Sequence, residues 1–211
     1  MQNNTFPGKF IAFEGLDGAG SSTEASKLCT WLNEIKKEES AEGVFAHLTK
    51  EPTNNLIGGM IRAQLTSVWQ SNPECLQLLF AADRSFHLEK EIIPLLKKGV
   101  TVVSDRYFFS TIAYGASKTA DFDWLLKINE PFLLPDITFL IKASPKTCLE
   151  RIRKNRSSFE LFEEEKTLAS VWKNYERLAS LFENVFLIDG EKPAEEVFSE
   201  IKKVVASNMD L

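Results

Sequence analysis

The stretch that decides the fold is Phe10-Ile11-Ala12-Phe13-Glu14-Gly15-Leu16-Asp17-Gly18-Ala19-Gly20-Ser21-Ser22-Thr23. Its first five residues are mostly apolar and predict a short strand buried on both faces. The glycine-rich segment after them runs directly into an amphipathic pattern, which predicts a helix over Ser22–Lys37. A strand, a tight turn and a helix in this order place the positive end of a helix beside the turn, where it can bind an anion.

The glycine-rich segment fits the phosphate-binding template G-x-x-x-x-G-K-[ST] at all but one of its fixed positions. Its glycines let successive N–H groups face phosphate oxygens, and the Ser22 hydroxyl is in register to bind Mg²⁺. The alternative is a glycine-rich turn without a ligand, against which the flanking strand and helix count. The residues predicted to bind the phosphates of ATP are Gly15, Gly18, Ala19, Gly20, Ser21, Ser22 and Thr23.

The position that departs from the template is Ser21, which stands where lysine belongs. That lysine normally bridges the β- and γ-phosphates, so its loss is expected to slow phosphoryl transfer. Either another cation takes its place, or the protein binds nucleotide and turns over slowly. The candidate replacements are Lys50, Arg153, Lys154 and Arg156.

Length and composition favour one globular domain spanning residues 1–211. The chain has 211 residues, 44% of them hydrophobic, and a formal net charge of −5. No run approaches the roughly 18 apolar residues of a membrane span, so we expect no membrane association. The acidic balance argues against a protein that coats nucleic acid. Three distant cysteines predict a reducing, cytoplasmic compartment.

Short apolar runs alternate with longer amphipathic stretches, which is typical of an open α/β sheet. In such a sheet, ligands bind beyond the carboxyl ends of the strands. The expected strands are Phe10–Glu14, Val44–Thr49, Val100–Ser104, Ile137–Ile141 and Val185–Ile188. The expected helices are Ser22–Lys37, Gly58–Thr66, Glu74–Leu96, Asp121–Asn129, Pro145–Arg153, Leu161–Phe182 and Pro193–Ala206.

Four further blocks lie at strand ends or on the helices after them. They are Thr49-Lys50-Glu51-Pro52, Leu79-Phe80-Ala81-Ala82-Asp83-Arg84, Ser104-Asp105-Arg106-Tyr107 and Ser110-Thr111-Ile112-Ala113-Tyr114. Together with the glycine-rich loop, they resemble the thymidylate kinase family from about Phe10 to Val205, and Val102–Asn129 is most similar to archaeal members.

This resemblance implies an α/β P-loop kinase fold, a three-layer α/β/α arrangement whose five-stranded parallel sheet is flanked by helices, with a short lid near residues 151–162. It also implies transfer of the γ-phosphoryl group of ATP to thymidine 5′-monophosphate (dTMP), giving thymidine 5′-diphosphate and ADP. Mg²⁺ would accompany ATP, and the protein would form a homodimer.

The resemblance also assigns the acceptor site. Arg106 and Arg62 would hold the acceptor phosphate beside Asp17, while Asp105 would bind Mg²⁺ through water together with Ser22. The predicted substrate-binding residues are Glu51, Arg62, Phe80, Arg84, Arg106, Ser110, Thr111 and Tyr114. The predicted catalytic residues are Asp17, Arg106, Arg153 and Arg156.

Phe80 and Arg84 also support a base site by their spacing, because residues four apart share a helix face. An aromatic ring can stack on a pyrimidine, and a guanidinium can donate to a base carbonyl. The alternative is a core phenylalanine beside a surface pair of Asp83 and Arg84. Tyr114 would pack beside the deoxyribose and exclude a 2′-hydroxyl, with a core tyrosine as the alternative.

Three other features bear on the expected site. The basic run that begins at Arg151 resembles the lid of the family. Because the glycine-rich loop lacks an arginine of its own, Arg153 or Arg156 is expected to neutralise the transferring group, and Arg156 is preferred. Gly115 stands where many members carry glutamine, which removes a possible contact to the base. His47 and His87 have no metal-ligand spacing and are interpreted as isolated packing or surface residues.

Two alternatives to a dTMP kinase remain open. A nucleotide-binding homologue with impaired catalysis would explain Ser21. A kinase for another deoxynucleotide or deoxynucleoside is the second, because Ala143–Arg151 resembles the corresponding region of the deoxynucleoside kinases. The Thr-Lys-Glu-Pro and Phe-Ala-Ala-Asp-Arg blocks argue against this second alternative.

Overall fold

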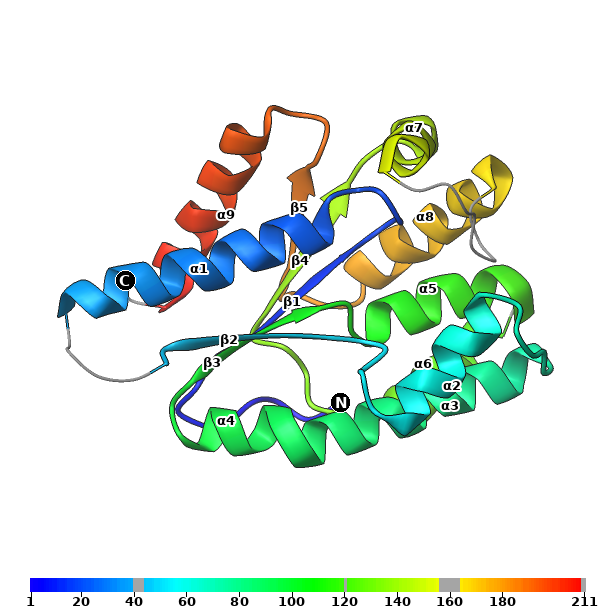
Figure 1. The fold of residues 1–211 in the computed structure, drawn as a ribbon, viewed down its shortest axis with the longest axis horizontal. Helices are drawn as coiled ribbons and strands as arrows, with labels where there is room; N and C mark the ends of the chain where they lie inside the picture. Colours follow the sequence, from blue (N-terminus) through cyan, green and yellow to red (C-terminus); the bar gives the residue numbers. More distant parts are fainter. Residues whose placement is uncertain (40–43, 120, 156–163, 210–211) are drawn as a thin grey trace.

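The structure is a computed structural model that describes residues 1–39, 44–119, 121–155 and 164–209. Five parallel strands form a sheet in the order β2-β3-β1-β4-β5 (Figure 1). The strands are β1 (Phe10–Gly15), β2 (Ala46–Lys50), β3 (Thr101–Asp105), β4 (Ile137–Lys142) and β5 (Val185–Asp189). The expected five-stranded parallel sheet is therefore confirmed.

Helices flank the sheet on both faces. They are α1 (Ser21–Glu39), α2 (Leu56–Leu65), α3 (Pro73–His87), α4 (Ile93–Lys97), α5 (Phe108–Thr119), α6 (Phe122–Asn129), α7 (Pro145–Asn155), α8 (Glu165–Ala179) and α9 (Ala194–Met209). Helices α1 and α9 pack together on one face, while α4 and α5 contact the other (Figure 1). This arrangement buries β1, the central strand, along its whole length, because every one of its residues is covered from both sides.

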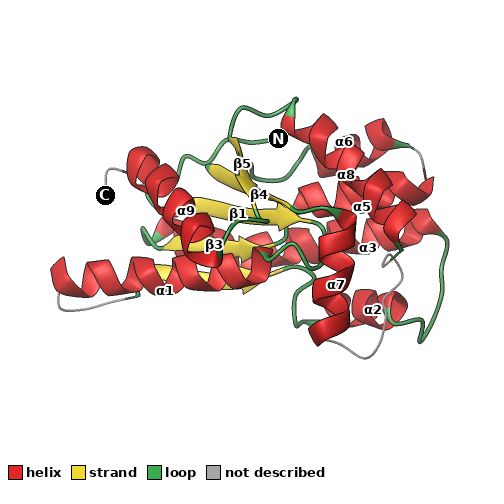
Figure 2. Cartoon of the chain, turned by 90° about the horizontal axis from the view of Figure 1, so that it is seen from above, coloured by secondary structure: helices red, strands yellow, loops and turns green. Residues whose placement is uncertain are grey.

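The register of the sheet gathers the ends of three strands. Phe13 on β1 pairs with Asp105 on β3, and Asp105 pairs in turn with Lys50 on β2. The strands point toward the side of the molecule where α2, α5 and α7 lie (Figure 2). Side chains that directly follow these strands therefore meet at one edge of the sheet.

The predicted helix over Glu74–Leu96 is interrupted by a π-helical turn, Leu88–Ile92, between α3 and α4. Pro94 has no N–H to donate to the preceding turn. The backbone widens just before it, and the Ile93 N–H donates to the carbonyl of Leu88, five residues earlier. A missing donor therefore explains why this long amphipathic segment is not a regular α-helix throughout.

Helix α5 is absent from the helices predicted above. Its segment is rich in aromatic and β-branched residues and contains Gly115, all of which lower helix propensity. Phe108, Phe109 and Ile112 are nevertheless fully buried, and α5 packs closely against α8. Tertiary burial rather than local preference stabilises this helix.

Two other predictions, a helix over Leu161–Phe182 and a lid over residues 151–162, lie partly outside the described residues. Helix α8 begins at Glu165, so the start of the predicted Leu161–Phe182 helix lies outside them. Of the expected lid, residues 151–155 form the end of α7, and residues 156–162 lie outside the described part. In the described residues, no helix is long and apolar enough to cross a membrane.

Candidate active site

A cleft of about 730 Å³ opens at the carboxyl ends of β1, β2 and β3. It collects predicted site residues from the glycine-rich loop, the strand ends and α2, α3 and α5. Those that line it are Asp17, Gly18, Ala19, Gly20, Ser21, Ser22, Thr23, Lys50, Glu51, Arg62, Phe80, Arg84, Asp105, Arg106, Ser110, Thr111 and Tyr114. Gly15 and Arg153 do not line it, and Arg156 lies outside the described residues.

The loop between β1 and α1 has the conformation that its glycines permit. Gly18 has a φ of +83°, and a Cβ there would lie 2.5 Å from the carbonyl oxygen of Cys148 on α7. Gly20 has a φ of +109°, a region that side chains disfavour. The loop therefore brings the first turn of α1, with its unpaired N–H groups, to the cleft.

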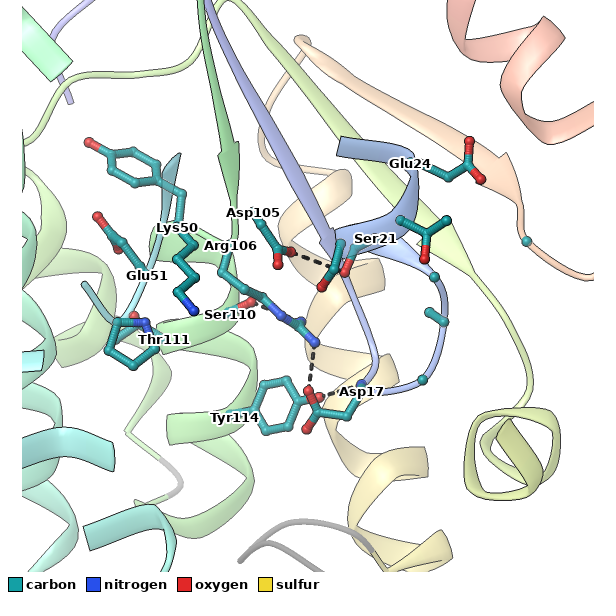
Figure 3. A pocket seen from close by; sticks show the side chains of 18 of the residues that line it. Asp17, Ser21, Glu24, Lys50, Glu51, Asp105, Arg106, Ser110, Thr111 and Tyr114 are labelled. Atoms are coloured by element: carbon teal, nitrogen blue, oxygen red, sulfur yellow. Dashed lines mark hydrogen bonds and ion pairs between the residues drawn. The ribbon is translucent and has the colours of Figure 1, made fainter. Parts of the chain in front are cut away.

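Ser21 is buried at the start of α1, and its Oγ donates to Asp105 Oδ1 at 3.4 Å (Figure 3). The hydroxyl therefore bonds to the end of β3 and is too short to extend along a bound triphosphate. Ser22, by contrast, is exposed and also lines the cleft. The departure from the template leaves the loop without a cation of its own.

Arg106 lies between the loop and α5. Its Nη2 donates to Asp17 Oδ1 at 2.7 Å, and its Nη1 donates to the carbonyl of Gly15 and to Ser110 Oγ (Figure 3). The backbone of Arg106 has a φ of +75°, which is uncommon for a residue other than glycine. Such strain is typical of functional positions, and here it places a guanidinium at the mouth of the loop.

A buried carboxylate supports Arg106 from below. Glu14 is fully buried at the end of β1, where it accepts from the Tyr107 N–H at 2.9 Å and from Ser110 Oγ. Tyr175 on α8 donates to Glu14 Oε2 at 3.3 Å and to the Gly15 carbonyl at 3.0 Å, and its hydroxyl accepts from Arg106 Nη1 at 3.1 Å. Two hydroxyl groups thus connect the buried carboxylate to the guanidinium.

Burial raises the pKa of Glu14 from 4.5 to about 7, because desolvation outweighs the opposing effects of Arg106 and of the hydrogen bonds. The folded protein thus binds more protons than the unfolded chain in this range, and stability falls as pH rises from about 4.5 to about 7. At about 1.36 kcal/mol per unit of pKa difference, this lowers the free energy of unfolding by about 3 kcal/mol. We expect Glu14→Gln to remove this part of the pH dependence. Urea unfolding of both proteins at pH 5 and pH 8 measures it. A variant that kept the full difference would assign it to other groups.

Arg84, on α3, is almost completely buried and lies in a network of its own. Its Nε and Nη2 donate to Glu51 Oε2 at 2.9 and 2.7 Å, Nη2 also donates to Thr111 Oγ1 at 2.8 Å, and Nη1 donates to Asn129 Oδ1 at 2.5 Å. Its guanidinium carbon lies 5.0 Å from the centre of the Tyr107 ring. The side chain is therefore fixed in place, unlike a solvent-exposed surface arginine.

Both histidines have carboxylate partners, which their interpretation as packing or surface residues without metal-ligand spacing did not include. His87 is buried, with Nδ1 3.2 Å from Glu51 Oε1 and Nε2 2.7 Å from Thr49 Oγ1. His47 Nε2 lies 2.8 Å from Glu91 Oε1. Glu51, which was expected beside the acceptor phosphate, has its two oxygens engaged by Arg84 and His87 instead. The sequence gives no signal for these contacts, because they join residues that are far apart along the chain.

Most cations of the cleft are already bonded. Arg62 donates to the carbonyls of Pro52 and Thr53, Arg151 donates to those of Ala19 and Gly190, and Lys192 pairs with Glu200. In the described part of the chain, the side chain of Lys50 has no hydrogen-bond or ion-pair partner, and its ammonium points into the cleft (Figure 3). Arg153 and Lys154 are exposed at the end of α7.

The site residues that the sequence predictions missed include Glu14, Gln77, Arg151 and Tyr175. Glu14 could have been found because it is a charged residue in an otherwise apolar strand. Gln77 could have been found because it lies three residues before Phe80 on the same predicted helix. Arg151 belongs to the basic run assigned to the lid. No local pattern marks Tyr175, because it reaches the site only when α8 packs against α5.

The oxygen atoms at the loop suit a magnesium ion. Mg²⁺ prefers oxygen ligands and usually binds through one or two carboxylates together with substrate phosphates and water. The Ser22 hydroxyl and the Asp105 carboxylate line the same cleft. Among the described residues, no group of three or more His, Cys, Asp or Glu side chains is arranged to hold a metal by itself. The residues present therefore fit an ion that arrives with a nucleotide.

Comparisons with known proteins agree with this geometry. The family model described as thymidylate kinase matches residues 13–201. A probable thymidylate kinase of Thermococcus kodakarensis is 35% identical over 200 residues, covering 91% of this chain and 94% of the relative. One from Archaeoglobus fulgidus is 36% identical over 202 residues, covering 95% and 96%.

A solved structure extends the likeness to three dimensions. The thymidylate kinase of Candida albicans superimposes with a TM-score of 0.82 at 25% identity, covering 97% of this chain and 94% of that one. The sequence match runs from β1 to α9 and so includes every strand of the sheet. On this shared sequence and fold, the chain belongs to the thymidylate kinase family.

Proposed function

We propose that this cleft transfers the γ-phosphoryl group of ATP to dTMP, with ATP on the glycine-rich loop and dTMP between α3 and α5. The activity is that of the family, and the division of the cleft into two sides supports the assignment. The loop and the first turn of α1 line one side, and Phe80 and Arg84 line the other. Arg106 lies between them, in contact with both the loop and α5.

The transfer requires positioning and charge neutralisation more than acid–base chemistry. An oxygen of the dTMP phosphate, already anionic at neutral pH, attacks the γ-phosphorus. The bond from this phosphorus to the β-bridging oxygen breaks, and ADP leaves with the electron pair. No proton must be removed from the nucleophile, so the cleft needs cations and N–H groups rather than a strong base.

Magnesium would be held by the Ser22 hydroxyl and, through water, by Asp105. When bound, the ion neutralises phosphate charge that these residues do not. The chain itself orients the triphosphate through the N–H groups of the loop Gly15–Thr23, which lie at the positive end of α1.

The acceptor phosphate is assigned to Arg106 and Arg62, whose guanidinium groups line the cleft. Planar guanidinium groups suit bidentate donation to phosphate. Asp17 keeps Arg106 at the loop through the contact of 2.7 Å. Ser110 and Thr111 lie on the same side and hold Arg106 and Arg84, respectively.

The nucleoside is assigned to the far side of the cleft. Phe80 stacks on the thymine, and Arg84, fixed by Glu51, donates to a base carbonyl. Tyr114 packs beside the deoxyribose, and its hydroxyl accepts from the Asp17 N–H at 2.9 Å. The tyrosine thereby connects the sugar site to the phosphate loop.

The cation that replaces the missing lysine is assigned to Lys50. Ser21 and Lys50 approach Asp105 from its two sides, because Ser21 donates to its carboxylate and Lys50 is its register partner on β2. Lys50 is also the cleft-lining cation of the described part that has no protein partner to give up. Arg153 and Arg156 are assigned to the lid, and their proposed role is to neutralise the transferring group.

We also assign the chain to a single domain with a lid near residues 151–162, to a homodimer and to the cytoplasm. Leu78, Ala82 and Phe86 form an apolar stripe along one face of α3, and both larger side chains are exposed, which supports a subunit interface there. The three cysteines are unpaired, which fits a reducing compartment.

A coupled assay for ADP release tests the function. With ATP and Mg²⁺, we expect dTMP to be phosphorylated at a higher kcat/KM than thymidine, dCMP or dUMP. The phosphate clamp explains the preference over thymidine, and the base site explains the preference over dCMP. Preference for thymidine would make the protein a deoxynucleoside kinase. Tight nucleotide binding without turnover on any acceptor would make it a nucleotide-binding homologue.

A further inference from the structure

Gln77 on α3 is a buried polar side chain that the folded chain leaves unsatisfied. It is only 3% exposed, and its Oε1 has no hydrogen-bond partner within the described residues. It also lines the cleft. Buried polar atoms are almost always paired, so an unpaired carboxamide oxygen at the wall of a cleft calls for a ligand that pairs with it.

The neighbours of Gln77 place it in the nucleoside side of the cleft. Phe80 and Arg84 follow it by three and seven residues, so all three project from one face of α3. Thr111, which also lines the cleft, accepts from Arg84 across the space between α3 and α5. The carboxamide therefore lies with an aromatic ring and a guanidinium that the proposed function assigns to the base.

Gly115 on α5 makes the room that Gln77 occupies. A Cβ at Gly115 would lie 2.9 Å from Gln77 Cδ and 3.0 Å from its Oε1. Both distances are shorter than ordinary contacts between carbon and its neighbours. Any side chain at position 115 would thus displace the carboxamide, and the absence of one allows α3 to supply a polar group at this point.

Two other buried side-chain atoms in the described part of the chain have no hydrogen-bond partner, and neither lies where it could bind the base of the acceptor. Asn184 does not line the cleft. Glu24 does, but it lies on the first turn of α1, and its other oxygen accepts from Lys27 at 3.1 Å. Gln77 alone among these three stands beside the residues assigned to the base.

We propose that Gln77 determines specificity by hydrogen bonding to the pyrimidine edge of the acceptor, an inference that rests on the proposed function. A thymine presents an N3–H donor between two carbonyl acceptors. A carboxamide can accept from N3–H and donate to an adjacent carbonyl. Stacking on Phe80 brings the plane of the base level with these groups.

Arg84 makes this arrangement selective. Four of its five N–H groups are used by Glu51, Thr111 and Asn129, which leaves one on Nη1 for a carbonyl of the base. Arginine is only a donor, so it disfavours the amino group that cytosine carries at C4. With the guanidinium satisfied by a carbonyl at C4, Gln77 directs its oxygen to the N3–H of thymine.

The test combines a variant with a modified substrate, dTMP methylated at N3. Wild-type protein should use this analogue poorly, because the methyl group removes the donor and collides with the carboxamide. In Gln77→Ala we expect kcat/KM for dTMP to fall about 10- to 100-fold, mainly through KM, with KM for ATP unchanged. The preference for dTMP over the methylated analogue should fall at least tenfold, because alanine leaves space for the methyl group.

Gln64→Ala is the matched control. Gln64 is also a buried glutamine, but its Oε1 accepts from Ser71 Oγ at 2.9 Å, and it does not line the cleft. The Gln64→Ala variant should leave the preference for dTMP over the methylated analogue unchanged. Thermal unfolding of both variants shows whether each is folded.

The outcomes separate this inference from the proposed function. Wild-type protein inactive on dTMP would refute the function. Wild-type protein that uses dTMP and the methylated analogue equally well would refute the role of Gln77 without any variant. An active wild type whose preference survives Gln77→Ala, or a variant that loses affinity for ATP and dTMP alike, would also reduce Gln77 to a packing residue.

Discussion

Lys50→Met is expected to lower kcat by about 10²–10³-fold, the loss measured when a comparable electrostatic donor is removed from an active site. The physical reason is that Ser21 cannot neutralise the charge that develops between the β- and γ-phosphates. Lys50 carries into the same cleft an ammonium that no described residue pairs with. The affinity for dTMP should change little, so single-turnover kinetics and dTMP titration should separate the two effects.

A second substitution makes this expectation sharper. Ser21→Lys restores the cation of the template, so the double variant Ser21→Lys/Lys50→Met should regain much of the lost rate. Lys142→Met is the matched control: Lys142 is the exposed last residue of β4, as Lys50 is of β2, but it does not line the cleft. It should leave kcat unchanged. If Ser21→Lys instead rescued Arg153→Ala or Arg156→Ala, with Lys50→Met active, a lid arginine would be the replacement.

Glu51→Ala is expected to lower the free energy of unfolding by about 3–5 kcal/mol, because it leaves the guanidinium of Arg84 buried without its counter-charge. Arg84 is 1% exposed, so water cannot replace the two hydrogen bonds it would lose to Glu51. The substitution also removes the nearer of the two carboxylates beside His87, which leaves Glu91 at 3.7 Å. Urea unfolding of the variant and the wild type gives the difference directly.

Two further variants isolate the ion pair as the cause. In Glu51→Leu/Arg84→Met, apolar side chains replace both charges, and we expect most of the stability to return, while dTMP binding weakens because Arg84 is gone. In Glu130→Ala, the loss of an exposed ion pair with Lys127 should change the free energy of unfolding far less than Glu51→Ala does. A loss in Glu51→Ala as small as that in Glu130→Ala would contradict a structural role for the pair.

The elements of the sheet were predictable because their signals are local. Each strand is a short run with few charges, and each is followed by a turn and an amphipathic segment. The glycine-rich loop, the strand ends and α3 line one cleft because parallel strands all end at the same edge of the sheet. Lys50, Asp105 and Arg106 accordingly line one cleft, at the edge where their strands end.

The failures share one physical cause, which is dependence on packing between distant segments. Helix α5 forms despite its poor propensity because Phe108 and Phe109 are buried beneath α8. The contacts of His87 and Tyr175 join them to residues far away along the chain. No spacing rule within a single segment reveals such partners.

The sequence alone determined the fold class, the glycine-rich turn between β1 and α1 and the family, because these depend on patterns within short segments and on their order. It also revealed that Ser21 leaves the loop without its lysine. Only the tertiary structure decided which side chains are already bonded and which line the cleft without a hydrogen-bond partner among the described residues. That distinction separates Arg84, held by Glu51, from Lys50 and Gln77, since hydrogen-bond partners are fixed by the packing of β2, α3 and α5.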